Sequence, residues 1–420
     1  MQHDQMNSAP GGSGPIVYGS NYGAFTSPTT DASGQPLPAA APARPRRKRG
    51  RGFYALLTAI IAAPLLVAVS SFVRAPYVIE SPGLTLDVLG EVSGRPVVSV
   101  DGLETFQTSG ELRMTTVSMR GGPGHHVTYL EVLGGWLDPD SRVIPEEEIF
   151  PQGTTQEQVD AQGAAQMVTS QENAMARALT EIGVRVPAKL AVVAAAQTSD
   201  ALGKLEENDQ LTFISAPGRE RVALEYYDTI HSYLSKVEPG TTVTIEYLRD
   251  GKPGKVDIVT MAPVNGATGG PLLGASGSRL GIYLTVDMDL PFDVSISVGE
   301  VSGPSAGLMF TLALIDKLTP GELTGGKKVA GTGTLGMDAT VGPIGGADLK
   351  IIGAKRDGAQ FFLLPVDNCA DVASGTPAGI QVVAVASLSE ARQALESISA
   401  GDVSSLQTCA QATARLQSQE

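Results

Sequence analysis

The sequence has few of the residues that build common catalytic sites. It contains four histidines and two cysteines among 420 residues. None of the histidines (His3, His125, His126 and His231) stands in a motif that proposes a catalytic triad. The sequence therefore gives no support to a histidine-based mechanism, and the chemistry has to come from other residue types.

Basic residues are scarce beyond the N-terminal part. The net charge is −14, yet residues 1–75 contain seven Lys or Arg and only two Asp or Glu, so the remainder carries a charge of −19. Proteins that bind nucleic acids need a basic surface, so we expect no nucleic-acid partner. The chain is long enough for two or three domains, and its 42% hydrophobic content is sufficient for cores of their own.

Charged residues are absent from the apolar run 53–73. A bilayer core requires about 20 such residues as a helix, and Pro64 would kink this helix without preventing a span. Six basic residues between 44 and 51 precede the run and only Arg74 follows it, so the positive-inside rule places the body of the protein outside. We expect an uncleaved anchor in the cell membrane that contacts lipid, with 1–52 as a disordered cytoplasmic tail; a cleavable signal peptide is the alternative.

The two cysteines, Cys369 and Cys409, both fall on the predicted outer side. A disulfide can persist there, and it would tie the C-terminal tail 401–420 to the preceding domain. Two buried free thiols are the alternative.

Residues 77–187 have mixed character. Short strands with turn residues between them are expected first, followed by a polar helix with a sparse apolar stripe from Thr155 to Ile182. We expect this extracytoplasmic region to pack on the domain that follows later in the chain.

Residues 188–262 have a pattern of their own. A segment from Leu205 to Leu211 leads into an expected strand, and the strand 241–247 is followed by Arg249-Asp250-Gly251. This pattern resembles a PDZ domain of the kind associated with bacterial proteases. PDZ domains bind a peptide C-terminus as an added strand at a sheet edge, so the resemblance implies peptide recognition. No Gly-Leu-Gly-Phe-like carboxylate loop occurs near 183–190, and a packing domain that only positions its neighbour is the alternative.

A linker rich in Gly, Pro, Ala and Ser, 263–279, separates this region from an α/β domain at 280–400. The remaining pattern alternates strands with helices. Strands are expected at 281–284, 294–298, 328–330, 361–365 and 381–385, and helices at 305–317, 347–357 and 388–395.

Ser305 follows Gly303-Pro304 and opens an apolar helix. Unpaired backbone N–H groups at a helix N-terminus favour an oxyanion nearby. Pro304 fixes the start of the helix, while Gly303, Ala306 and Gly307 leave room for a substrate backbone. Serine is also a preferred helix N-cap, and capping is the commoner role for a serine taken alone.

Lys350 follows 45 positions after Ser305 in an otherwise apolar helical segment, next to Ile351 and Ile352. Burial there would lower the pKa of its amine, as a general base requires. A neutral lysine that takes the proton of a serine forms a Ser-Lys dyad, which needs neither histidine nor metal. We therefore expect no metal and no cofactor.

Three glycine-rich segments accompany these two residues, namely Gly303–Gly307, Gly331-Thr332-Gly333 and Gly342–Gly346. Together with Lys350 they resemble the proteolytic domain of Lon proteases over about 120 residues. The resemblance implies that Ser305 is the nucleophile, that Lys350 is the general base and that the Thr332 hydroxyl helps to hold the lysine. Ala347-Asp348-Leu349-Lys350 departs from the usual Leu-Lys-Glu-Lys of Lon but keeps the lysine.

The ATPase module of Lon has no counterpart in the sequence. Gly321–Lys328 is similar to a phosphate-binding loop, but it lacks the final Ser or Thr and follows no strand. The order of anchor, PDZ-like domain and Lon-type domain resembles the membrane-anchored, PDZ-containing Lon-like proteases of bacteria. The predicted fold class is thus an α/β (α+β) proteolytic domain with a β-rich PDZ-like domain and one N-terminal transmembrane helix.

The resemblance implies an ATP-independent serine endopeptidase that cuts peptides or unfolded protein segments outside the membrane, assisted by the PDZ domain. It is also compatible with a homo-oligomer, since Lon-type domains often assemble into rings. Two alternatives stay open. One is a membrane-tethered PDZ adaptor whose Lon-like domain is inactive, and the other is a regulator that cuts only itself or one partner.

Overall fold

The computed structural model describes Ser33 and residues 51–417, except for 265–276, Pro291, Glu300 and Ser374. Nearly all of the tail predicted at 1–52 and most of the linker predicted at 263–279 thus lie outside the described residues.

Helix α1 runs over Arg51–Ser70 and contains Pro64. It ends three residues short of the predicted span 53–73, and no helix in the described part of the chain is long and apolar enough to cross a membrane. The predicted transmembrane helix is therefore not supported.

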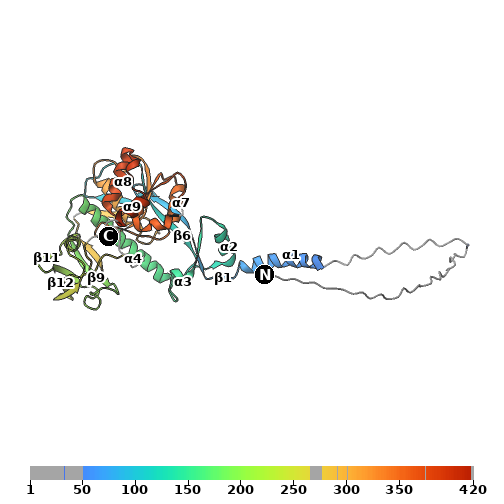
Figure 1. Ribbon diagram of the computed structural model, residues 1–420, viewed down its shortest axis with the longest axis horizontal. Helices are drawn as coiled ribbons and strands as arrows, with labels where there is room; N and C mark the ends of the chain where they lie inside the picture. Colours follow the sequence, from blue (N-terminus) through green and yellow to red (C-terminus); the bar gives the residue numbers. More distant parts are fainter. Residues whose placement is uncertain are drawn as a thin grey trace, which may run out of the picture. The chain divides into compact units, whose positions relative to one another are not determined.

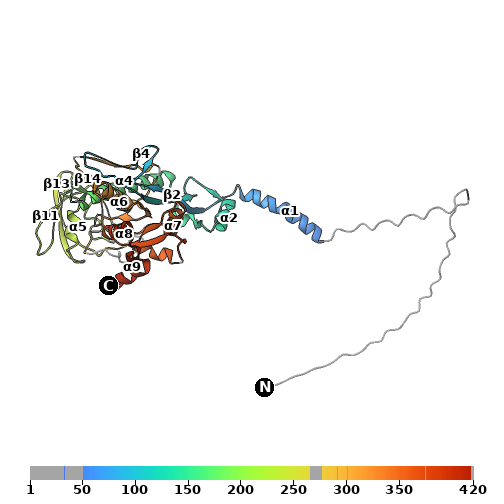
Figure 2. The same cartoon turned by 90° about the horizontal axis from the view of Figure 1, so that it is seen from above.

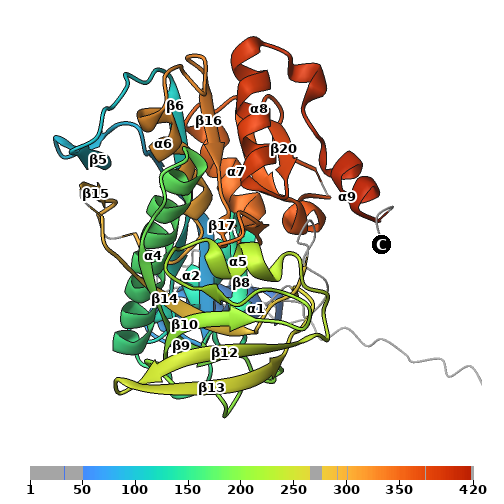
Figure 3. The same ribbon diagram turned by 90° about the vertical axis from the view of Figure 1, so that its left-hand side faces the viewer.

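Residues 64–420 form one compact unit. One of its sheets has six strands in the order β20-β19-β16-β6-β2-β8 (Figure 3). The first four strands in this order pair in parallel, and β2 pairs antiparallel with both of its neighbours, β6 and β8. The strands are β2 (Tyr77–Asp87), β6 (Glu111–Arg120), β8 (Arg142–Pro145), β16 (Lys328–Gly331), β19 (Phe361–Pro365) and β20 (Gln381–Val385). Every residue of β19 is buried, as expected for a parallel strand covered on both faces.

Four helices pack around this sheet: α4 (Gln156–Glu181), α6 (Gly307–Leu318), α7 (Ala347–Arg356) and α8 (Leu388–Ala400). Helix α6 is buried along nearly its whole length, because its sequence is almost entirely apolar. Helix α4 packs against α6, and Figure 2 shows the two together. A capping box of Thr155 and Gln158 begins α4. One hydrophobic core joins residues from β6, α4 and α6, including Leu112, Met167 and Leu312.

A second sheet has the order β13-β12-β10-β9-β14, with β11 paired to β10. It consists of β9 (Ala188–Ala195), β10 (Gln210–Ser215), β11 (Val222–Ala223), β12 (Thr242–Arg249), β13 (Lys252–Val259) and β14 (Ile282–Met288), with helix α5 (Thr229–Leu234). Leu190, Ile214, Tyr227 and Ile245 belong to its separate hydrophobic core. Figure 1 shows these strands grouped apart from α7 and α8.

Strand β14 corrects one expectation. The sequence predicts that its residues belong to the domain at 280–400, but β14 pairs antiparallel with β9 over Ile282–Met288. Leu280 and Val286 pack in the core of the second sheet, which fixes the strand there. The second sheet therefore ends at Met288 rather than at residue 262.

The remaining elements are short. They are β1 (Arg74–Ala75), β3 (Glu91–Val92), β4 (Arg95–Pro96), β5 (Val98–Asp101), β7 (Val127–Thr128), α2 (Tyr129–Leu137), α3 (Glu146–Ile149), β15 (Asp293–Ile296), β17 (Thr334–Leu335), β18 (Val341–Gly342), the 3-10 turns η1 (Val366–Val372) and η2 (Val403–Ser405), and α9 (Cys409–Gln417). Strand β5 pairs with β15, and β17 pairs with β18 in a tight hairpin.

Candidate active site

The structure brings Ser305 and Lys350 into direct contact. Lys350 Nζ donates a hydrogen bond to Ser305 Oγ at 2.9 Å and another to Thr332 Oγ1 at 3.1 Å. Lys350 lies in the first turn of α7, whose N-cap residue is Gly346 with φ +66°. A Cβ at Gly346 would come within 2.5 Å of the Val117 side chain, so only glycine allows α7 to start at this point.

Burial lowers the pKa of Lys350 to about 8. Its side chain lies in the protein interior, and the residue is only 4% exposed. Because a buried ammonium loses its hydration, the neutral amine is favoured, and a substantial fraction of Lys350 is neutral near pH 8. A neutral amine 2.9 Å from a serine hydroxyl can accept the hydroxyl proton.

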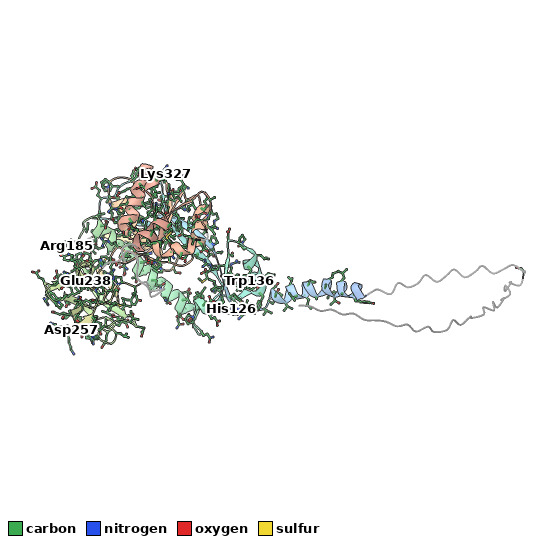
Figure 4. All side chains as sticks on the ribbon, in the orientation of Figure 1. His126, Trp136, Arg185, Glu238, Asp257 and Lys327 are labelled. Carbon is green, nitrogen blue, oxygen red and sulfur yellow. A yellow bond between two sulfur atoms is a disulfide. The ribbon has the colours of Figure 1, made fainter. Side chains whose placement is uncertain are left out.

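Two other lysines of this region, Lys327 and Lys328, are less suitable as the general base. Lys327 is exposed to solvent (Figure 4). Lys328 forms an ion pair with Glu111 at 2.6 Å. Neither therefore lies in the protein interior as Lys350 does.

Ser305 does not cap the helix that follows. Helix α6 begins at Gly307 with Ala306 as its N-cap residue, and no side chain caps it. The helix expected at 305–317 thus starts two residues later. The hydroxyl of Ser305 accepts the hydrogen bond from Lys350, so the geometry favours a chemical role over the capping role.

Thr332 and Gly333 hold the backbone of the serine. The carbonyl oxygen of Ser305 accepts hydrogen bonds from Thr332 Oγ1 at 3.0 Å and from Gly333 N at 2.8 Å. Thr332 is fully buried and contacts both members of the pair. A Cβ at Gly333, where φ is +152°, would meet the Val341 side chain at 2.8 Å. The Gly-Thr-Gly segment therefore fixes the distance between serine and lysine.

Helix α4 supports the same loop from the other side. Gly163 O accepts a hydrogen bond from Gly303 N at 3.1 Å, and Ser170 Oγ donates one to Pro304 O at 3.1 Å. A Cβ at Gly163 would lie 3.0 Å from the Ser302 side chain. Sequence reasoning missed Gly163 and Ser170. A glycine inside a helix lowers the stability of the helix, so its presence indicates that another segment lies close to it. Gly163 was therefore the residue from which the contact of α4 with the loop could have been predicted.

A cavity of about 460 Å³ opens beside the pair. Its lining includes Ser305 and Lys350 and is otherwise rich in apolar side chains. These come from β6, α4 and the loop before Ser305: Met114, Val117, Met119, Met167 and Val301. Glu80 of β2 is its charged member besides the lysine, and burial raises the pKa of this carboxyl. The cavity can accommodate an apolar side chain next to the serine hydroxyl.

Cys369 and Cys409 form a disulfide, with 5.4 Å between their Cα atoms. It joins η1 to α9 at the C-terminal end. Among the described residues no cluster of three or more His, Cys, Asp or Glu side chains could hold a metal ion.

Part of this chain is similar to known proteins. Residues 291–397 match the family of the Lon protease (S16) C-terminal proteolytic domain. The chain is 29% identical over 178 residues to Lon protease 1 of Sorangium cellulosum, covering 37% of this chain and 20% of that protein. It is 36% identical over 121 residues to Lon protease 2 of Herpetosiphon aurantiacus, covering 28% and 15%. Lon protease 1 of Bacillus subtilis is 34% identical over 90 residues, covering 20% and 11%.

The matched segments thus span a fifth or less of the length of these Lon proteases. Among solved structures, the PDZ domain of an SdrC-like protein from Listeria monocytogenes matches 23% of this chain and 85% of its own. The identity is 22% and the TM-score 0.18, a score at which the likeness establishes no fold. The homology to Lon proteases supports a serine peptidase, and residues 291–397 are similar to the Lon proteolytic domain.

Proposed function

We propose that this protein is an ATP-independent serine endopeptidase in which Ser305 and Lys350 form the catalytic dyad. The observation that carries the proposal is the 2.9 Å hydrogen bond between Lys350 Nζ and Ser305 Oγ, at a lysine whose pKa burial lowers to about 8. A buried base in contact with a serine hydroxyl is the arrangement that nucleophilic catalysis without histidine requires.

The reaction follows from this geometry. Neutral Lys350 takes the proton of Ser305 as Oγ attacks the peptide carbonyl carbon, and backbone N–H groups near the start of α6 stabilise the oxyanion. The lysine then gives this proton to the leaving amine as the peptide bond breaks, which leaves an acyl ester on Ser305. A water molecule deprotonated by Lys350 attacks the ester, and the returning proton restores the serine hydroxyl.

The cavity suggests the substrate. Its methionine and valine side chains favour an apolar residue next to the scissile bond, and methionine adapts to varied shapes. We infer that the substrates are peptides or unfolded segments, which expose apolar side chains in extended form. Peptide recognition by the domain at 188–288 is part of the proposal. Attachment to a membrane through 53–73 and a location outside the cell stay predictions from the sequence.

Degradation of an unfolded protein such as casein, without ATP, tests the proposal. We expect Ser305→Ala and Lys350→Ala each to abolish cleavage, because either change removes a reacting group. Lys327→Ala is the matched control, since this lysine is exposed, and it should cleave like the wild type. Cleavage that survives both dyad substitutions would refute the mechanism.

A membrane-tethered adaptor without proteolytic activity is the second candidate. It predicts that peptides bind and stay intact. The buried contact between Ser305, Thr332 and Lys350 argues against this candidate. Burial of an amine costs free energy, and an inactive site would gain nothing in return.

A further inference from the structure

A carboxylate lines the cavity beside the candidate serine. Glu80 of β2 shares this lining with Ser305 and Lys350, and only 13% of its side chain is exposed. It lies directly opposite Met119 of β6, which also lines the cavity. Opposite residues of paired strands have their side chains on the same face of the sheet, so the acidic group lies next to an apolar wall. The catalytic steps derived above make no use of Glu80.

The charges around Glu80 are not balanced. On its other side Glu80 lies opposite Arg142 of β8, whose Nη1 is 3.6 Å from the Glu80 carboxylate. Helix α7 packs on β2, and Arg142 Nη2 donates hydrogen bonds to both carboxylate oxygens of Asp348 in α7 at 2.6 Å. Glu80 itself accepts no hydrogen bond from the residues that the structure describes. One guanidinium therefore serves two carboxylates, and one negative charge at the cavity has no cation of its own.

This charge is unfavourable where it lies. Burial raises the pKa of the Glu80 carboxyl, Arg142 lowers it, and the nearby charge of Asp348 raises it. A charge taken out of water costs free energy unless an opposite charge and hydrogen bonds compensate it. Because Glu80 lines the cavity, a cation that binds in the cavity supplies this compensation.

We propose that Glu80 binds the cationic end of a lysine or arginine side chain of the substrate, at a residue next to the scissile bond. The inference rests on the proposed function and refines the apolar side chain that it assigns to the cavity. Lysine and arginine have long aliphatic stems that lie against apolar surface while the charged end reaches a polar partner. Here the ammonium or guanidinium donates hydrogen bonds to Glu80. The stem lies against the apolar part of the lining: Met114, Val117, Met119 and Met167.

The same charges act against acidic substrates. A glutamate or aspartate side chain in the cavity would add a third carboxylate to Glu80 and Asp348, with only Arg142 to balance them. Like charges repel strongly where water is largely excluded. The order of preference at this position is therefore basic, then apolar, then acidic.

The catalytic test compares reporter peptides of one sequence, with the C-terminus as an amide, in which either residue flanking the cleaved bond is lysine, norleucine or glutamate. At one of these two positions we expect kcat/KM to be about tenfold higher for lysine than for norleucine, the usual size of a hydrogen bond to a charged group. Glu80→Gln should bring this ratio to about one, and Glu80→Lys should place glutamate above lysine. Glu181→Gln, which removes a carboxylate paired with arginine outside the cavity, is the matched control and should keep the ratio.

A binding test keeps the inference separate from proteolysis. The lysine and norleucine peptides, each with a fluorophore, are titrated into Ser305→Ala protein, which cannot cleave them. We expect the lysine peptide to bind about tenfold more tightly, and Glu80→Gln in the same protein to remove this difference, with thermal unfolding as a check that the variant folds. Equal affinities and equal kcat/KM for the two peptides in protein with Glu80 intact overturn the inference, while cleavage itself still supports the proposed function. A protein that prefers the lysine peptide in binding but cleaves neither peptide would refute the proposed function alone.

Discussion

At the scale of single residues, the main feature is a lysine in the protein interior, where burial makes its positive charge unfavourable. Lys350 is nearly fully buried, contacts two hydroxyl oxygens and has a pKa lowered to about 8. The sequence predicted this burial from the apolar neighbours of the lysine. It could not predict which hydroxyls meet the amine, because that depends on how α7, β16 and the loop before α6 pack. A serine taken alone before a helix is more often a helix cap than a nucleophile. The structure separates these two roles, because α6 begins two residues after Ser305 and the serine does not cap it.

The lowered pKa leads to a prediction about rate. Lys350 must be neutral to accept the serine proton, so kcat should fall at low pH, rise through about pH 8 and level off above it. Peptide hydrolysis measured across the pH range checks this. A rate that is flat from pH 6 to about pH 9 would contradict a base with this pKa.

The same pKa leads to a prediction about stability. Below pH 8 the lysine is charged in both states, and the folded state is destabilised by the full shift from 10.5 to about 8, or about 3 kcal/mol. Lys350→Met should therefore raise the free energy of unfolding at neutral pH by up to this amount. The gain should shrink as pH rises from about 8 and vanish above 10.5, where the wild-type amine is neutral in both states. Urea unfolding at several pH values measures it, and an equal gain at all pH values would point to packing instead.

At the scale of secondary-structure elements, the site depends on segments outside the residues similar to Lon. Helix α4 and strand β6 supply Met167, Met114 and Met119 to the cavity, and α4 also holds the loop before Ser305 through Gly163 and Ser170. The expected polar helix at 155–182 matches α4 closely, because its capping residues and periodicity are local signals. The contact of α4 with Ser302 depends on tertiary packing, which a local sequence pattern cannot predict.

Gly163→Ala tests this support. Alanine favours a helix interior by about 1 kcal/mol over glycine, so the variant should unfold at an equal or higher temperature. Its Cβ would approach Ser302 at 3.0 Å and displace the loop, so kcat should fall markedly. Gly134→Ala in α2 is the control, because a Cβ there meets nothing within 4 Å, and its activity should be unchanged. Full activity in Gly163→Ala would mean that α4 does not position the serine.

At the scale of the whole molecule, the catalytic sheet is assembled from distant parts of the sequence. Strands β2, β6 and β8 come from residues 77–145, yet they share a sheet with β16, β19 and β20. The alternation of strands and helices predicted the α/β class. It could not predict that β6 pairs with β16, nor that β14 belongs to the other sheet, because pairing partners are chosen by packing between segments far apart in the chain.

The Cys369–Cys409 disulfide also acts at this scale, because it closes a loop with a sequence separation of 40. A cross-link that closes a loop of this length restricts the unfolded chain, and loss of the disulfide should cost about 4 kcal/mol. Cys409→Ser, or the wild type under reductant, should therefore unfold at a lower temperature while its activity at low temperature persists, since the bridge lies outside the dyad. Calorimetry with and without reductant measures this, and equal unfolding temperatures would show that the bridge adds no stability.

The central claim is that Lys350 activates Ser305, and covalent labelling tests it most directly. A fluorophosphonate reacts with an activated serine, and mass spectrometry of the digested protein locates the modified residue. The account predicts labelling at Ser305, faster as pH rises through about 8, and lost in Lys350→Ala but kept in Lys327→Ala. Labelling of Ser305 at the same rate in Lys350→Ala would contradict it.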